Sequence, residues 1–163
     1  MNDIEMLRVL IFESVAKLYA NDSYLINRGG MELACKIRVA IYMQEILLNN
    51  PMFRQWRHYD LDCEYNKSTS TSGLKEIPCA RKYIQTDLVL HIRGTNQFNL
   101  LACEFKLTAA DIFIPKYGKP SDAAKLQDLT DERLDYKYRL GCAIALEKQG
   151  PVYKFFQNAQ IID

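Results

Sequence analysis

The segment Asn99–Lys106, NLLACEFK, is a short apolar run that ends in two opposite charges, Glu104 and Lys106. Side chains alternate along a strand, so these two charges would share a face, roughly 7 Å apart at about 3.3 Å per residue. The run before them is apolar on both faces, which is typical of a strand in the interior of a sheet. A charge in that setting costs free energy unless a partner or a metal neutralises it.

The preceding segment offers a matching acid. In Thr86–Ile92, TDLVLHI, Asp87 stands at the start of an apolar run. The connection TNQF suits an antiparallel hairpin. Pairing about a loop centred near Asn96 places Asp87 opposite a position near Lys106, with Glu104 as a diagonal neighbour. Two carboxylates and an amine would therefore converge on one patch.

Such a patch has a specific chemistry. Two carboxylates roughly 4–6 Å apart repel, and one would be protonated unless a cation sits between them. Oxygen ligands without a nearby His or Cys select a hard ion such as Mg²⁺ or Mn²⁺. The ion polarises a phosphate and lowers the pKa of a bound water, while an adjacent lysine orients that water and stabilises charge developing on phosphorus. The pattern would support hydrolysis of a phosphodiester.

Apolar residues at helical spacing predict two helices in the first third of the chain. The first extends to a polar, glycine-bearing break at NDSYLINRGG, and its apolar positions are Ile4, Leu7, Ile11, Val15 and Leu18. The second extends from about Gly30 to Asn49 and is closed by Pro51. Its apolar side is expected to consist of Leu33, Ile37, Ala40, Ile41, Leu47 and Leu48.

Strands are expected around the central hairpin and near the C-terminus. The segment 58–66 alternates like a half-buried strand, 83–94 and 99–106 form the hairpin, and 140–147 and 152–157 supply one or two later strands. Ser121 is a candidate N-cap for a helix that includes Lys125. The order predicts a single α/β domain over residues 1–163.

Composition restricts the class of protein. With 163 residues, 48% hydrophobic and 25% charged, the chain has ordinary globular composition and can bury a core. A formal net charge of +1 favours no polyanionic partner by itself. No apolar run approaches the roughly 18–20 residues that span a bilayer, and the acidic N-terminal segment does not resemble a signal peptide. Five scattered cysteines without a CxxC spacing indicate a reducing, cytoplasmic compartment.

A helix acid, an Asp at a strand start and Glu-x-Lys on the next strand together resemble the PD-(D/E)XK nuclease superfamily. Three segments, DCEYNK (62–67), TDLVLHIRGTNQFNLLACEFK (86–106) and DAAKLQDLT (122–130), are also similar to a family of small uncharacterised bacterial proteins. The corresponding segments of that family read DCEYNR, PDIIVHRRG, NLLVIEIK and DLxKLxxLT. The similarity covers most of the chain from Glu32 to Gly141. It implies a restriction-endonuclease-like fold, in which a mixed central β-sheet is flanked by α-helices.

The resemblance also implies a role for each matching residue. Asp87 and Glu104 would be metal ligands, and Lys106 would position the attacking water. Glu32, on the second predicted helix, would complete the metal shell. Lys125 matches the lysine of a late helix and would contact a phosphate or stabilise the site. The implied activity is that of a Mg²⁺- or Mn²⁺-dependent nuclease, with DNA as the expected substrate.

Alternatives remain open for substrate and activity. An RNA-directed nuclease would use the same chemistry, and a non-catalytic nucleic-acid-binding module could retain the scaffold with a decayed site. Thr86 stands where the similar proteins have proline, a departure that would suit such a module. Lys67 and Lys75, beside a Ser/Thr-rich loop, are expected to hold phosphates by Coulomb attraction. A homodimer is a further hypothesis, because a domain this small contacts little duplex by itself.

Several of the charged residues also have ordinary structural interpretations. Glu32 and Lys36 are spaced i,i+4 and could form a surface ion pair that contributes about 0.3 kcal/mol. Glu64 shares a face of the first strand with Asp62, and the two acids either extend the acidic patch or line the solvent side. His91 has no metal-spaced partner and is expected to be a hydrogen-bonded residue rather than a base.

Overall fold

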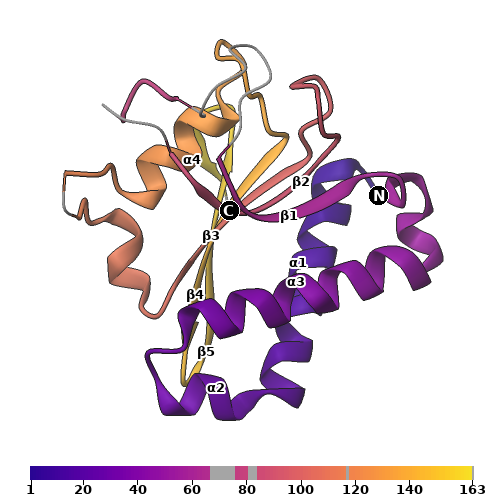
Figure 1. The fold of residues 1–163 in the computed structure, drawn as a ribbon, viewed down its shortest axis with the longest axis vertical. Coiled ribbons are helices and arrows are strands. Elements are labelled where there is room, and N and C mark those ends of the chain that lie inside the picture. The colour runs from indigo at the N-terminus through magenta and orange to yellow at the C-terminus, as the bar shows by residue number, and fades with distance from the viewer. Residues whose placement is uncertain (67–75, 81–83, 117, 163) are drawn as a thin grey trace.

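A mixed β-sheet forms the centre of the protein (Figure 1). The computed structural model describes residues 1–66, 76–80, 84–116 and 118–162. Within these residues, six strands lie side by side in chain order: β1 (Asp60–Tyr65), β2 (Thr86–His91), β3 (Leu101–Lys106), β4 (Leu140–Glu147), β5 (Gly150–Gln157) and β6 (Gln160–Ile162). β3 and β4 are parallel, and the other neighbouring strands are antiparallel. The predicted α/β class with a mixed sheet is confirmed.

β2 and β3 form the predicted antiparallel hairpin across the TNQF connection. β3 lies between β2 and β4 and its first five residues are buried, so the predicted interior position of this strand is confirmed. The pairing is centred slightly earlier than predicted, because Leu88 is the partner of Cys103. Continuing this register by one residue places Asp87 across from Glu104, and not from Lys106.

Two long helices cover one face of the sheet. They are α1 (Asp3–Asn21) and α3 (Glu32–Asn49), joined by the short α2 (Ser23–Arg28). α1 begins with a capping box, in which Asn2 and Glu5 each accept a hydrogen bond from the other's backbone N–H at 2.9 Å. Its predicted apolar side is confirmed, with Ile4 partly buried and four positions fully buried: Leu7, Ile11, Val15 and Leu18.

The predicted buried side of α3 is partly wrong. Four of the positions expected in the core are exposed: Leu33, Ile37, Ile41 and Leu48. The side that faces the core consists instead of Cys35, Lys36, Val39, Tyr42, Met43, Ile46 and Leu47. α3 is apolar on most of its circumference, so periodicity alone could not choose its orientation. Packing against α1 and the sheet determines it.

The opposite face of the sheet carries α4 (Asp122–Thr130) and the short 3₁₀ helix η2 (Ala109–Phe113). Ser121 caps α4 as predicted, because its hydroxyl accepts a hydrogen bond from the Ala124 N–H at 3.2 Å. Alternate residues of β2, β3 and β4 point into each of the two cores, one under α1 and α3 and one under α4. The sheet is therefore covered by helices on both faces (Figure 1).

The sequence analysis did not predict four short elements, α2, η1 (Pro51–Trp56), η2 and β6. The five cysteines are free thiols, and three of them are buried: Cys35, Cys103 and Cys142. Among the residues that the structure describes, no helix combines the length and the apolar character needed to cross a bilayer.

Gly141→Val should destabilise the fold, because α4 packs directly against this point of β4. A Cβ atom at residue 141 would lie 3.1 Å from Thr130 Cγ2 and 3.3 Å from Leu126 Cβ, closer than ordinary contact. Overpacking of this kind costs about 1–3 kcal/mol in the free energy of unfolding, measurable by urea denaturation. Ala16→Val, on the exposed side of α1, is the control and should cost less than about 1 kcal/mol. Equal losses in the two variants would contradict close packing of α4 on β4.

Candidate functional site

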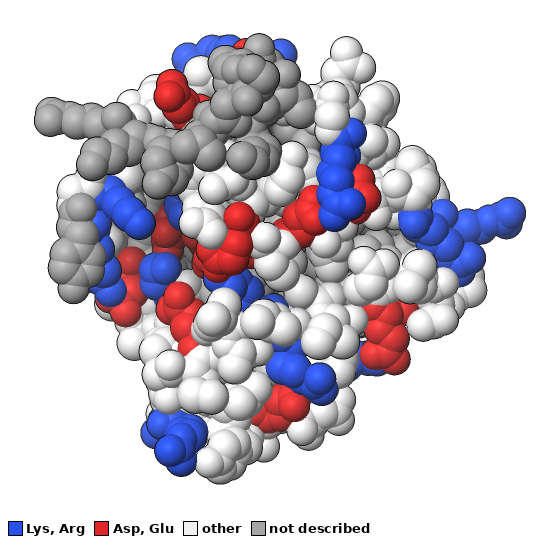
Figure 2. Space-filling model, in the orientation of Figure 1, with Lys and Arg blue, Asp and Glu red and all other residues white. Residues whose placement is uncertain are grey.

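Acidic side chains of three neighbouring strands form one row at the same end of the sheet. The β1–β2 register places Glu64 across from Asp87, and the β2–β3 register places Asp87 across from Glu104. Lysines of α3 and α4 reach this row from opposite faces of the sheet. Figure 2 shows acidic and basic side chains alternating in the region between these two helices. The group is termed the charged cluster and consists of Glu32, Lys36, Glu64, Asp87, Glu104, Lys106, Asp122 and Lys125.

Asp87 is held by two hydrogen bonds. Its Oδ1 accepts from Lys36 Nζ at 2.9 Å, and its Oδ2 accepts from the backbone N–H of Phe105 at 2.8 Å. The second bond fixes the carboxylate against β3, next to Glu104. Burial by itself would raise the pKa of Asp87, but the Phe105 N–H and the Lys36 ammonium outweigh it and hold that pKa below its ordinary value. Asp87 is therefore ionised at neutral pH.

Glu104 is the most deeply buried acid of the row, with 2% of its side chain exposed. Its Oε2 lies 2.7 Å from Lys125 Nζ, whereas its Oε1 is buried and has no hydrogen-bond partner among the described residues. Burial raises the pKa of Glu104 to about 8, although the neighbouring Lys125 acts in the opposite direction. The row thus contains a buried carboxyl oxygen that no group of the described protein satisfies.

Lys106 lies on the same face of β3 as Glu104 but bonds elsewhere. Its Nζ is 2.7 Å from Asp122 Oδ2 and donates to the Phe105 carbonyl at 3.0 Å. Burial would lower the pKa of Lys106, but the hydrogen bond with Asp122 raises it above its ordinary value. Because 21% of the side chain is exposed, the charged ammonium borders solvent.

Lys125 joins two acids of the charged cluster. Its Nζ lies 2.7 Å from Glu104 and 3.5 Å from Asp122, and it donates to the Gln85 carbonyl at 3.2 Å. Burial would lower the pKa of Lys125, but Glu104 and Asp122 raise it above its ordinary value. Only 12% of the Lys125 side chain is exposed, and its ammonium is paired with acids of the cluster. Of the two roles predicted for Lys125, these contacts suit stabilisation of the site better than phosphate binding.

Glu32, the first residue of α3, is the member of the charged cluster that forms no ion pair with another described residue. The alternative i,i+4 pair with Lys36 is not formed, because the Lys36 ammonium bonds to the strands instead. Within the described residues, the Glu32 carboxylate has no hydrogen-bond partner. Burial raises the pKa of Glu32, the Lys106 charge lowers it and the Asp87 charge raises it further. Glu32 therefore lies close enough to interact electrostatically with Asp87, the middle acid of the row, and with Lys106.

Lys36, Glu64 and Asp122 are the three members of the charged cluster that the sequence analysis did not assign to the site. Lys36 is buried in the first turns of α3, with 5% of its side chain exposed, and forms ion pairs with Glu64 and Asp87. Glu64 has φ 54°, a conformation that residues other than glycine rarely adopt. Gln85 Nε2 donates to the second oxygen of Glu64. The Glu64 carboxylate is therefore held on both of its oxygens.

The spacing of the sequence contains a signal for two of the missed residues. Lys36 follows Glu32 by one helical turn, so both side chains can reach the same end of the sheet. Asp122 precedes Lys125 by three residues, which places both on one side of α4. For Glu64 the sequence analysis left two alternatives open, and the structure agrees with the one in which this acid extends the acidic patch. Its left-handed backbone conformation was not predictable, because nothing in a glutamate favours it.

The charge balance of the cluster suits a divalent cation. Among the described residues it holds five carboxyl groups and three ammonium groups, so full ionisation leaves two negative charges in excess. Its donors are carboxylate oxygens, which suit Mg²⁺ or Mn²⁺, and the Glu104 Oε1 has no hydrogen-bond partner in the described part of the chain. No three His, Cys, Asp or Glu side chains of the described residues are gathered closely enough to form a metal site. The carboxylate oxygens therefore suit Mg²⁺ or Mn²⁺, but several of them form ion pairs with lysines.

The outcome differs among the remaining residues that the sequence analysis considered. Lys67 and Lys75, expected to hold phosphates, fall outside the described residues. Asp62 accepts a hydrogen bond from Arg93 Nε at 2.8 Å and lies 2.9 Å from His91 Nε2. Asp62 therefore does not extend the acidic row. The prediction that His91 is a hydrogen-bonded residue is confirmed.

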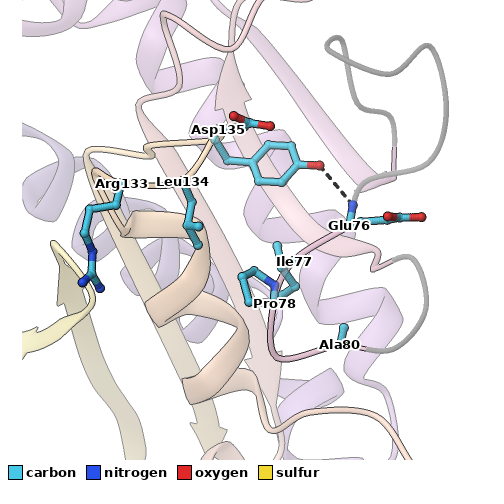
Figure 3. A pocket seen from close by; sticks show the side chains of 8 residues that line it. Glu76, Ile77, Pro78, Ala80, Arg133, Leu134 and Asp135 are labelled. Carbon is cyan, nitrogen blue, oxygen red and sulfur yellow. Dashed lines mark hydrogen bonds between the residues drawn. The ribbon is translucent and has the colours of Figure 1, made fainter.

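A separate hollow of about 450 Å³ lies beside α4 (Figure 3). It is lined by Glu76, Ile77, Pro78, Ala80, Arg133, Leu134, Asp135 and Tyr136. Figure 3 shows the charged groups of Glu76, Arg133 and Asp135 pointing in different directions. The hollow shares no residue with the charged cluster and gathers no converging reactive groups. The charged cluster is therefore the candidate site.

Comparisons with protein-family models, with curated proteins and with solved structures found no match for the chain. The function of the charged cluster therefore has to be inferred from its own geometry. That geometry is a row of three acids across β1, β2 and β3, neutralised in part by lysines of α3 and α4.

Glu104→Gln should change how stability depends on pH. Burial raises the pKa of Glu104 to about 8 in the folded protein. An exposed glutamate has a pKa of about 4.3. The folded state retains a proton that the unfolded chain releases, so this contribution is fully present below about pH 4 and is lost as the pH rises toward 8. In urea denaturation without metal, Glu104→Gln should therefore gain stability relative to wild type between about pH 5 and about pH 8.

Glu13→Gln, which changes an exposed acid of α1, is the matched control. Its difference in stability from wild type should stay constant over the same range. A constant difference for Glu104→Gln as well would contradict a protonated, buried carboxyl group at residue 104.

Proposed function

We propose that the protein is a metal-dependent nuclease that hydrolyses phosphodiester bonds in DNA, on a restriction-endonuclease-like fold. The observation that carries this proposal is the position of Asp87 beside Glu104 at the ends of adjacent strands. Lys106 is the next residue on the same face of β3. A mixed sheet with helices on both faces supports the proposed fold.

Asp87, Glu104 and Glu32 are proposed to hold Mg²⁺ or Mn²⁺. Such an ion would polarise the scissile phosphate and lower the pKa of a bound water. Asp87 is kept ionised by the Phe105 N–H and Lys36, and Glu104 offers an oxygen without a partner among the described residues. Glu32 belongs to the charged cluster, and no ion pair with a described residue competes for its carboxylate.

Lys106 is proposed to orient the attacking water. Asp122, 2.7 Å away, keeps the ammonium protonated and in a defined position. A protonated lysine donates hydrogen bonds to a water and stabilises the negative charge that develops on a phosphate in the transition state. Asp122 would then be a positioning residue, because it acts through Lys106.

The substrate is assigned by resemblance and chemistry. Lys67 and Lys75 are proposed to contact phosphates of the substrate by Coulomb attraction, which does not depend on base sequence. Lys125 is proposed to support Glu104. An RNA-directed nuclease would need the same acids and lysine, so the 2′-hydroxyl of the substrate separates the two activities.

Purified protein should cleave DNA in Mg²⁺ or Mn²⁺ and should stop when a chelator is added. The substrates are single-stranded, duplex and branched DNA, together with RNA. Asp87→Asn and Lys106→Met should each lower the rate at least about 100-fold, since each removes a group proposed to act in the transition state. Lys148→Met, at an exposed lysine between β4 and β5, is the matched control and should keep the wild-type rate.

Each contrary outcome of this assay has a definite meaning. Cleavage of RNA alone would replace the DNA nuclease by the RNA-directed one. Binding of nucleic acid without cleavage in either metal would indicate a non-catalytic module. Cleavage by Lys106→Met at the wild-type rate would contradict the proposed role of that lysine.

We also propose that the chain forms a homodimer through the exposed apolar side of α3. Four side chains on this helix are 45–59% exposed: Leu33, Ile37, Ile41 and Leu48. A row of large apolar residues on one side of a helix is typical of an interaction surface. Two copies of α3 packed against each other would cover the exposed apolar side chains of both helices. The row starts beside Glu32, so the partner would lie next to the charged cluster.

The double variant Ile37→Lys with Ile41→Lys should convert a dimer into a monomer, because each charge would be buried in the interface. Sedimentation velocity at micromolar concentrations measures the change. Ile161→Lys, at an exposed residue of β6, is the control and should leave the dimer intact. A monomeric wild-type chain at the highest concentration tested would exclude the dimer.

A further inference from the structure

We propose that Lys36 is a cationic placeholder at the candidate metal site. Without a divalent cation, the Lys36 ammonium binds both Asp87 Oδ1 and Glu64. When Asp87 binds a divalent cation, the Lys36 ammonium keeps its ion pair with Glu64 only. The inference rests on the proposed nuclease function, because it concerns the same acids, and it assigns to Lys36 and Glu64 the control of metal access.

The contacts of Asp87 show why Lys36 and a cation compete. Asp87 Oδ2 is taken by the Phe105 N–H at 2.8 Å, and Oδ1 accepts from Lys36 Nζ at 2.9 Å. Oδ1 is therefore the oxygen that Asp87 can offer to a metal. An ammonium and a divalent cation bound to one oxygen would repel each other strongly in this partly buried setting. One has to leave before the other binds.

The position of Lys36 on α3 is unusual. All residues of α3 are described, and Lys36 is the charged residue on its buried side, among Cys35, Val39, Tyr42, Met43, Ile46 and Leu47. A lysine with 5% of its side chain exposed is destabilising unless acids pair with it. The core positions around it hold the helix in place, so the ammonium can change partner by rotation of its side chain.

Glu64 provides the second position for that ammonium. The strand order places β2 between β1 and β3, so Glu64 and Glu104 flank Asp87 on opposite sides. Movement of the Lys36 ammonium toward Glu64 therefore carries it away from Glu104. A cation bound by both Asp87 and Glu104 would then no longer meet that ammonium on Asp87.

The conformation of Glu64 supports this role. Its φ of 54° is a costly conformation for a glutamate and interrupts the β1–β2 ladder opposite Asp87. Gln85 holds the other carboxylate oxygen, so Glu64 is fixed where it receives the ammonium. Since 41% of the Glu64 side chain is exposed, against 17% for Asp87, the ammonium would move toward solvent as it leaves Asp87.

Competition predicts opposite effects for the two partners. Lys36→Met removes the competitor, so Mn²⁺ should bind at least about tenfold more tightly, as expected when the binding-competent fraction rises from a tenth to nearly all. Glu64→Gln removes the second position, so Lys36 stays on Asp87 and Mn²⁺ should bind about tenfold more weakly. Isothermal titration of each purified full-length chain with Mn²⁺ measures both, and circular dichroism checks that each variant is folded.

Lys106→Met is the charge-matched control, because it removes the same charge from the cluster without touching Asp87. It should tighten Mn²⁺ binding clearly less than Lys36→Met does. If the affinity for Mn²⁺ rises equally in the two lysine variants, the cause is the loss of one positive charge and not the loss of a competitor at Asp87. That result would overturn the placeholder.

The remaining outcomes separate the two proposals. If wild type binds Mn²⁺ and neither Lys36→Met nor Glu64→Gln changes the affinity, the placeholder is overturned and the nuclease proposal stands. If no variant and no wild-type chain binds Mn²⁺, the metal-dependent site itself is overturned. Binding that appears only in Lys36→Met would support the placeholder. If Lys36→Met does not fold, Glu64→Gln decides, since unchanged affinity overturns the proposal and weaker binding supports it.

Discussion

A carboxyl group buried at the end of an interior strand cannot stay ionised without a nearby cation. Glu104 is such a group, and the arrangement of the charges around it depends on this requirement. β3 lies between β2 and β4, and only 2% of the Glu104 side chain is exposed to water. Lys125 of α4 supplies the nearest positive charge, at 2.7 Å. The close approach of α4 to β4 at Gly141 sets the position of that helix. Core packing and site electrostatics are therefore coupled through α4.

The lysines around the row explain how so many acids coexist in one place. Lys36 lies between Glu64 and Asp87, and Lys125 lies between Glu104 and Asp122. Each ammonium lowers the repulsion between the acids on either side of it. The excess of two negative charges that full ionisation would leave among the described residues is the electrostatic basis of the proposed divalent cation. The placeholder follows from the same balance, because a site that binds a cation needs a stable form without it.

The sequence analysis located the strands and the acids better than their partners. Apolar alternation and a hairpin connection were enough to place Asp87 beside Glu104, although the ladder is centred slightly earlier than predicted. The orientation of α3 was not predictable, because Leu33, Ile37 and Ile41 are as apolar as the residues that face the core. The position of Lys36 depended on that orientation. Its spacing from Glu32 could place Lys36 at the same end of the sheet, but its ion pair with Asp87 could not be predicted without the orientation of α3.

By itself, the sequence determined the α/β class, the interior position of β3 and the acids at the ends of β2 and β3, because strand alternation and hairpin spacing are local properties. The tertiary structure decided which lysine neutralises which acid. Lys36, Lys106 and Lys125 come from three different elements, and their partners depend on how α3 and α4 are rotated and packed against the sheet. It also decided the backbone of Glu64, since a left-handed glutamate is stable only where surrounding contacts hold it.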